Sequence, residues 1–414
     1  MKSILVLLLA LLVFKDTLGF PFPQVWRIAI QSVCLCIGVY WITLHARTSL
    51  LTRYGTLFLY LTALLFSMLG ARNPVYVLLQ VGSLAAVFLF FAAYFESGWD
   101  RLQGMDRYET LVRTAALLYL TVAVLGLLAA ILRPELAFET ETTHRRLEGL
   151  FPEPGMLANA AGLLVGLSLF GLKRRWFKWP ALCAGLLCLA LTLSRTNWAA
   201  TLLAVVATGW LYHKSGRRWI LAGSGVLASA VVVVLLLNLS PDPGRFELVR
   251  PESLPTLSGR TNLWRAAIPA FRASPVVGHG YTTGTEAIID VAKREDSRYL
   301  DYLGSLKARR GTMHNGYVQS LVDSGLFGLL VYLVLLLGAL HHLVQRDVDR
   351  LYPAFFYVMV YGILANLGKN FIYSASVSDS VLFWAVAVFA WSLRERPLEE
   401  PAGTIPAHAH GIPV

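Results

Sequence analysis

The sequence predicts an all-α polytopic membrane protein, and three observations support this fold class. The chain of 414 residues is 56% hydrophobic and has a mean hydropathy of +0.58, which is not the composition of a soluble domain. Apolar runs recur from end to end, and each approaches the roughly 20 residues that a helix needs to cross a bilayer. Charged residues make up only 15% of the chain and lie mostly in short clusters between these runs. Since a helix satisfies its own backbone in lipid, we expect a helical bundle.

The formal net charge of +11 would suggest nucleic acid as a partner in a soluble protein. In a membrane protein it is better explained by basic residues that set the topology and by a basic long loop. The four cysteines, at positions 34, 36, 183 and 188, all fall inside apolar runs. No disulfide framework in a loop is therefore expected.

About twelve transmembrane helices are expected, one at each apolar run. The runs lie near residues 3–20, 25–44, 55–71, 75–95, 110–132, 155–172, 179–194, 196–213, 218–239, 317–341, 353–371 and 379–393. The first run is the weakest, because its apolar core from Ser3 to Phe14 is short enough for a signal peptide. No small-x-small cleavage site follows it, which favours an uncleaved first helix.

The distribution of lysine and arginine predicts that both termini are cytoplasmic, because cytoplasmic loops of membrane proteins carry an excess of positive charge. With the N-terminus inside, alternate loops hold most of the clustered basic residues. These inner-loop residues are Arg47, Arg53, Arg101, Arg107, Lys173, Arg174, Arg175, Lys178, Lys214, Arg217, Arg218, Arg346, Arg350, Arg394 and Arg396.

Two predicted outer loops are long. One lies near residues 133–155, within the first region (1–239) that carries helices one to nine. The other is a large periplasmic loop at 240–316, far too long for a connector and therefore expected to be functional, with short helices near Leu263–Phe271 and Thr285–Lys293. Residues 317–393 follow as helices ten to twelve, and 394–414 as a disordered cytoplasmic tail.

Basic residues on the outer side are the candidate functional residues, because they oppose the topology signal. Arg195 lies in a very short outer turn between the seventh and eighth runs. An arginine that reaches the lipid headgroups, with Ser194 capping the next helix, is the plainer explanation. That explanation suits a cytoplasmic turn better, which favours a functional role for Arg195.

Arg260 and Arg265 open an amphipathic segment of the large loop, and a glycine-rich turn around His279 follows it. Glycines let a backbone approach a ligand closely. Alternatively, the segment is a loop helix anchored at the membrane interface by Trp264.

His314 immediately precedes the tenth run, at the outer membrane surface, and Asp323 lies further along the same run. His314 either titrates in a reaction or only hydrogen-bonds the start of the helix. Asp323 is either buried and paired with a basic residue or part of a local kink with Ser324 and Gly325.

These residues carry a resemblance to a known family. The Thr-Leu-Ser-Arg-Thr block at 192–196, the Gly-Arg…Leu-Trp and Pro…Gly-His-Gly blocks at 259–280, and the His-Asn-Gly-Tyr…Gly-Leu-Phe-Gly-Leu block at 314–329 resemble, in order and spacing, the signature of the O-antigen ligase/O-antigen polymerase superfamily. Residues 146–151 are also similar to its Arg-x-x-Gly-x-Phe segment. Where ligases often have a Pro-Asn pair, this chain has Glu153-Pro154-Gly155, which looks more like exopolysaccharide polymerases.

The resemblance implies an inverting, metal-independent transfer of a glycan from a polyprenyl diphosphate carrier to an acceptor hydroxyl, at the outer face of a bacterial inner membrane. It implies no cofactor. Arginines suit this chemistry because their planar forks bind phosphate oxygens and stay charged. We therefore expect Arg195 and Arg260, with Arg265 as a weaker third, to bind the diphosphate, and His314 to act as the base or to contact phosphate. Supporting roles fall to Arg146, His279 and Asp323.

The acceptor is left open between lipid A–core, a growing glycan chain and a protein hydroxyl, with ligase and polymerase nearly tied. The alternative of another class is a polysaccharide transporter or flippase. Transporters usually place charged groups near the bilayer midplane, often in repeated halves, whereas Arg27, Arg113 and Lys369 lie near the ends of runs, where their side chains can reach the interface. A purely structural membrane scaffold is the third interpretation.

Overall fold

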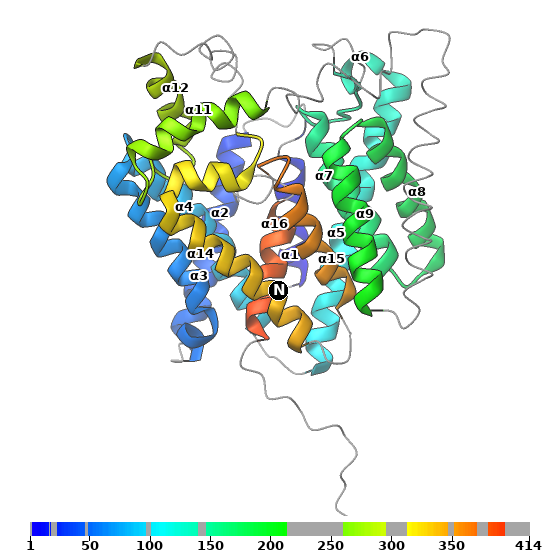
Figure 1. The fold of residues 1–414 in the computed structure, drawn as a ribbon. Coiled ribbons are helices and arrows are strands. Elements are labelled where there is room, and N and C mark those ends of the chain that lie inside the picture. The colour runs from blue at the N-terminus through cyan, green and yellow to red at the C-terminus, as the bar shows by residue number, and fades with distance from the viewer. Residues whose placement is uncertain are drawn as a thin grey trace, which may run out of the picture.

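The computed structural model describes residues 2–15, 17, 23–45, 49–96, 101–139, 146–212, 260–294, 313–346, 352–370 and 380–393 (Figure 1). Within these ranges the chain consists of helices joined by turns and bends, with a single antiparallel bridge between Phe138 and Leu147. The main helices are α1 (Lys2–Phe14), α2 (Pro23–His45), α3 (Ser49–Phe66), α4 (Pro74–Glu96), α5 (Arg101–Leu132), α7 (Pro154–Phe170), α8 (Arg175–Leu191), α9 (Arg195–Tyr212), α11 (Arg260–Ala273), α12 (Gly284–Arg294), α14 (Gly316–Arg346), α15 (Pro353–Ala365) and α16 (Ser380–Ser392). Two single turns, η1 (Ser67–Gly70) and α6 (Pro134–Ala137), complete the described elements.

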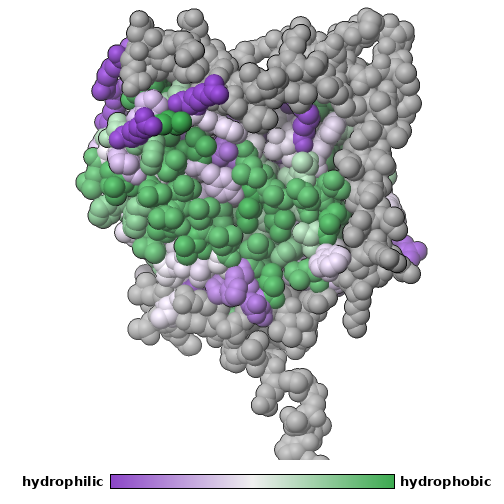
Figure 2. Space-filling model, in the orientation of Figure 1, coloured by the Kyte–Doolittle hydropathy of each residue, from purple (hydrophilic) through white to green (hydrophobic). Residues whose placement is uncertain are grey.

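Four of the described helices are long and apolar enough to cross a membrane, and they correspond to α3 with η1, α4, α5 and α14. Five shorter apolar helices accompany them, including α7, α15 and α16. Every residue of α16 is buried, because this helix is apolar all round and sits in the middle of the bundle. Figure 2 shows a band of hydrophobic side chains across the face in view, with polar side chains above and below it, as a protein embedded in a bilayer requires.

Each apolar run predicted from the sequence contains a described helix, except the run at 218–239, which lies outside the described residues. The number of membrane crossings and the region boundaries stay predictions. The predicted tail at 394–414 also lies outside the described part. The tenth run differs from a straight span, because α14 has a non-helical residue, Gly325, with φ of 66°. The kink that the sequence suggested around residues 323–325 is therefore present.

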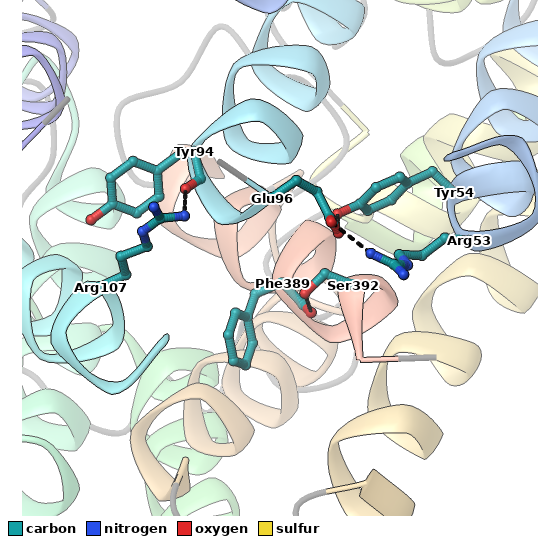
Figure 3. A network of polar contacts seen from close by, with 7 residues as sticks. All are labelled: Arg53, Tyr54, Tyr94, Glu96, Arg107, Phe389 and Ser392. Atoms are coloured by element: carbon teal, nitrogen blue, oxygen red, sulfur yellow. Dashed lines mark hydrogen bonds and ion pairs between the residues drawn. The ribbon is translucent and has the colours of Figure 1, made fainter. Parts of the chain in front are cut away.

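One end of the bundle gathers basic residues from several predicted inner loops. Figure 3 shows Arg53 and Arg107 on either side of the last turn of α4. The guanidinium of Arg53 lies 2.6 Å from the carboxylate of Glu96, and Arg107 donates to the carbonyl of Tyr94. We call this the α4 end.

The long loop is partly folded at the other end of the bundle, which we call the loop end. Here α11 and α12 cover the first part of α14 (Figure 1). The predicted short helices near 263–271 and 285–293 are thereby confirmed. A small second core joins these elements, and its buried residues are Ala266, Ala267, Ala270, Ile288, Ile289, Met313 and Val322. Residues 240–259 and 295–312 of this loop lie outside the described part.

Candidate functional site

The glycine-rich turn of the loop is clamped onto the kink of α14. The backbone N–H of His279 donates to the carbonyl of Val322 (3.0 Å), and that of Gly280 donates to the carbonyl of Asp323 (2.8 Å). A Cβ atom at Gly278, where φ is 71°, would lie 2.5 Å from the carbonyl carbon of Asp323. The close backbone approach expected from these glycines is therefore made to α14.

Asp323 completes this clamp with its side chain. The carboxylate is fully buried and accepts hydrogen bonds from the backbone N–H groups of Thr282 (2.8 Å) and Gly284 (2.7 Å), and from the side chain of Gln319 (2.8 Å). Gly284 is the first residue of α12, so the negative charge also faces the positive end of that helix. Asp323 and His279, whose ring lies 2.6 Å from the carbonyl of Ala270, hold the loop in place.

The clamp brings α11 to His314. The indole N–H of Trp264, one turn after Arg260, donates to the carbonyl of Met313 (3.0 Å). His314 itself has a left-handed backbone, with φ of 48°, which a non-glycine residue adopts only where the surrounding contacts fix it. Asn315 then caps α14, since its side-chain oxygen accepts from the N–H groups of Tyr317 (2.9 Å) and Val318 (3.1 Å).

The start of α14 meets the start of α9 at the turn that follows α15. The N–H of Gly316 donates to the carbonyl of Asn366 (2.9 Å), and the side-chain amide of Asn315 donates to the carbonyl of Leu367 (3.1 Å). A Cβ atom at Gly368 would overlap the side chain of Thr196, in the first turn of α9. His314 and Arg195, 119 positions apart in the chain, are thus brought to the same turn.

Lys369, in this turn, forms an ion pair with Glu153, directly before α7. The two charged groups lie 3.1 Å apart. The Lys369 side chain is only 18% exposed, whereas that of Glu153 is 58% exposed. The ammonium of Lys369 is the main cause that holds the pKa of the Glu153 carboxyl below its ordinary value; partial burial opposes it, and the charges of His314 and Arg146 add to the lowering. The carboxylate of Glu153 therefore lies within electrostatic reach of Lys369, His314 and Arg146.

Arg146 supports the turn that carries Arg195. Its Nε atom donates to the carbonyl of Thr192 (3.1 Å), and its guanidinium lies 3.5 Å from the carboxylate of Glu139. Next to it, the N–H of Leu147 donates to the carbonyl of Leu191 (3.0 Å). The predicted outer loop near 133–155 thus folds back and fixes the α8–α9 turn.

These residues form what we call the loop-end cluster: Arg146, Glu153, Arg195, His314 and Lys369. Helices α7, α9 and α14 all begin at this cluster, so three positive helix ends meet there. Three cations and a histidine accompany a single carboxylate within the cluster, and Glu139 pairs with Arg146 from the side. This arrangement favours an anionic ligand with several oxygens.

Arg265 lies outside this cluster. It is exposed and lines an open pocket of about 380 Å³ between α11 and the first part of α14, together with apolar residues that include Ile268, Phe271 and Leu321. Arg260 begins α11, one turn from the Trp264–Met313 contact, but the placement of its side chain lies outside the described part.

Sequence reasoning missed Glu153 and Lys369 as site residues. Lys369 was expected to extend to the membrane interface, but it is mostly buried against α7 because residue 155 is a glycine; a Cβ atom there would overlap its ammonium. The available signal was the Glu-Pro-Gly sequence at 153–155. Proline favours the first position of a helix, so the sequence places an acidic residue directly before a helix whose second residue is glycine.

Comparison with known proteins agrees with the signature found in the sequence. Residues 180–333 match the family described as O-antigen ligase, and this range includes Arg195, Arg260, Arg265 and His314. A segment of 99 residues is 35% identical to the exopolysaccharide production protein ExoQ of Rhizobium meliloti (strain 1021). That segment covers 23% of this chain and 22% of the relative. The match at residues 180–333 and this segment support the resemblance of the chain to the O-antigen ligase/polymerase superfamily.

Proposed function

We propose that the protein is a membrane glycan transferase that moves an oligo- or polysaccharide from a polyprenyl diphosphate to an acceptor hydroxyl. The observation that carries this proposal is the loop-end cluster, where three helix N-termini meet beside Arg146, His314 and Lys369, and where the exposed Arg195 begins α9. An anionic headgroup at this cluster, with its prenyl chain in lipid, satisfies both the charge and the hydrophobicity of the site.

The proposed transfer requires that the site stabilise the diphosphate as it leaves. In an inverting transfer the acceptor oxygen attacks the anomeric carbon, the bond from that carbon to the phosphate oxygen breaks, and the lipid diphosphate leaves with the added negative charge. Arg195 and Arg260 are assigned to this diphosphate, and Arg265 is assigned as a weaker third contact. Permanent guanidinium charges stabilise such a transition state without a metal ion.

His314 is assigned the acceptor proton. Its left-handed backbone, between Met313 and the Asn315 cap, places this residue at the start of α14. An imidazole titrates near neutral pH and accepts the proton of the hydroxyl as the new bond forms. A contact between His314 and phosphate is the second role open to it.

The orientation follows from the basic residues of the α4 end, which belong in the cytoplasm. The loop end then faces the periplasm of a bacterial inner membrane, both termini are cytoplasmic, and α11 and α12 of the loop lie on the periplasmic side. The acceptor is a glycan: a growing chain for a polymerase or lipid A–core for a ligase. The Glu-Pro-Gly sequence at 153–155 favours a polymerase, and the similarity to an exopolysaccharide production protein of Rhizobium favours an exopolysaccharide as the product.

The test is glycan transfer by the purified protein in EDTA, with a polyprenyl-diphosphate oligosaccharide as donor. Arg195→Ala, Arg260→Ala and His314→Ala should each lower transfer at least about a hundredfold while the variants stay folded. Full activity in folded variants would overturn the site assignment. Absence of transfer by the wild type, together with movement of the carrier across liposomes, would replace the proposal by a flippase.

A further inference from the structure

The position of Lys369 is a poor one for a lysine whose only task is structural. Its partner Glu153 is 58% exposed, and ion pairs with an exposed partner add little stability. The lysine side chain is only 18% exposed, so most of its hydration is lost. The ammonium also lies against the first turn of α7, where the positive end of the helix disfavours a cation.

Two features nevertheless keep the ammonium in this place. Gly155, the second residue of α7, has no side chain, and the ammonium occupies the space that a Cβ atom would fill. The turn before Lys369 is fixed on both sides, by Gly368 against Thr196 of α9 and by the Asn315–Leu367 hydrogen bond from the start of α14. The lysine is therefore held between the starts of three helices.

An anion at this point removes the electrostatic disadvantage. A phosphate group that lies beside the ammonium at the start of α7 interacts favourably with both the ammonium and the positive helix end, and it brings more negative charge than one carboxylate. Since Glu153 is close to His314 and Arg146 as well, a ligand that replaces it at Lys369 enters the cluster where the proposed donor binds.

We propose that Lys369 is a further diphosphate-binding residue. Gly155 makes room for its ammonium. The carboxylate of Glu153 pairs with this ammonium until the diphosphate of the donor displaces the carboxylate. The inference rests on the proposed function and adds to it a residue outside the 180–333 match. Glu153 then acts as a competitor of the donor as well as the partner that holds Lys369 in position.

This proposal predicts opposite effects for the two partners of one ion pair. Lys369→Met should weaken binding of farnesyl diphosphate on the order of tenfold, because a charge-assisted contact is lost. Glu153→Gln should leave binding unchanged or tighten it a few-fold, because the amide oxygen still accepts from the ammonium while the competing charge is gone. Lys369→Arg should retain most of the affinity, and Gly155→Ala should weaken binding by displacing the ammonium.

Farnesyl monophosphate provides the second arm, since it shares the prenyl tail and lacks the outer phosphate. Binding of both compounds is measured by calorimetry on the purified full-length protein in detergent. Lys173→Met is the matched control, because Lys173 pairs with Glu109 at the α4 end of the bundle. Lys369→Met should lose more affinity for the diphosphate than for the monophosphate, and Lys173→Met should lose neither.

Three outcomes separate the inference from the function it rests on. If the wild type binds the diphosphate and Lys369→Met binds it equally well, the role of Lys369 is wrong while the function stands. If Lys369→Met and Glu153→Gln weaken binding alike, the pair is structural and the inference is also wrong. If the wild type binds neither compound, the proposed function fails first. Should Lys369→Met not fold, Gly155→Ala and Lys369→Arg decide the question.

Discussion

The two polar ends of the bundle treat their charged residues differently. At the α4 end, Arg53 and Glu96 are 18% and 11% exposed, and the hydroxyl of Tyr54 gives Glu96 a second hydrogen bond of 2.8 Å (Figure 3). At the loop end, Lys369 is buried to the same extent, but its partner Glu153 is 58% exposed and shares its charge with two further basic residues. The first pair is enclosed and balanced, whereas the second leaves positive charge in excess.

This difference separates structure from function within one molecule. Arg107 of the α4 end, which donates to the Tyr94 carbonyl, also lies over the ring of Tyr94, with 5.6 Å between the guanidinium carbon and the ring centroid. A guanidinium engaged by a carbonyl and an aromatic ring has few N–H groups free to bind a ligand. A cluster with unbalanced charge, in contrast, lowers stability and is retained where a substrate supplies the missing charge. The comparison predicts that substitutions at the two ends affect different measurements.

The largest effect on stability is expected from the clamp. It lies at the loop end, but its buried carboxylate is fully matched by hydrogen-bond donors, as Glu96 is matched at the α4 end. Asp323→Ala leaves the N–H groups of Thr282 and Gly284 buried without their acceptor, which should lower the free energy of unfolding by about 4 kcal/mol. Thermal unfolding in detergent checks the loss, and limited proteolysis within 274–294 should become faster. Unchanged proteolysis would show that the clamp does not hold the loop.

The clamp also shows how far the sequence alone could lead. The apolar runs predicted the helices, and the short loop helices could be predicted because their own residues are amphipathic. The role of Asp323 could not be predicted, because its two backbone hydrogen-bond partners, Thr282 and Gly284, lie about 40 positions away in the chain. The same holds for Lys369, whose partner Glu153 is 216 positions away. Side chains that act through distant partners carry no local pattern.

Residues that lie in a local signature could be proposed as site residues from the sequence. Arg146, Arg195 and His314 could be named from the sequence because each lies in a short block of the family signature, and the structure brings these blocks to one turn. His279 and Asp323 also lie in blocks of this signature, but their contacts hold the loop against α14. A family signature therefore contains both residues proposed for the reaction and residues that hold the fold. The contacts in the structure are needed to distinguish the two kinds.

The second prediction tests the balanced pair at the α4 end. Glu96→Gln removes the charge opposite the mostly buried guanidinium of Arg53, and it should lower the free energy of unfolding by about 3 kcal/mol. Binding of farnesyl diphosphate should stay within twofold of the wild type once the variant is folded. Thermal unfolding and calorimetry measure the two effects. Weakened donor binding in the folded variant would show that the two ends are coupled, against the comparison above.

A smaller effect is expected from the contact that joins α11 to the residue before His314. Trp264→Phe keeps the aromatic packing but leaves the carbonyl of Met313 without the indole N–H, which should cost about 1 kcal/mol. Because His314 follows Met313 directly, the rate of glycan transfer should fall by more than the stability loss explains. Single-turnover transfer measures this rate, and Trp176→Phe, at an exposed position on α8, is the control. Equal rates in both variants would mean that α11 does not position His314.

The smallest effect is the pH dependence of the Glu153–Lys369 pair. Because the pKa of Glu153 is lower in the folded protein than its ordinary value of 4.5, its contribution to stability is complete above pH 4.5 and is lost as the pH falls through the lowered pKa. Protonated Glu153 resembles glutamine, so the wild type should exceed Glu153→Gln in melting temperature at pH 6 and lose this advantage toward pH 3. The advantage should be slight, since the carboxylate is largely exposed. A difference that is the same at every pH would show that Glu153 contributes by packing, and the charge excess of the loop end would then need another source.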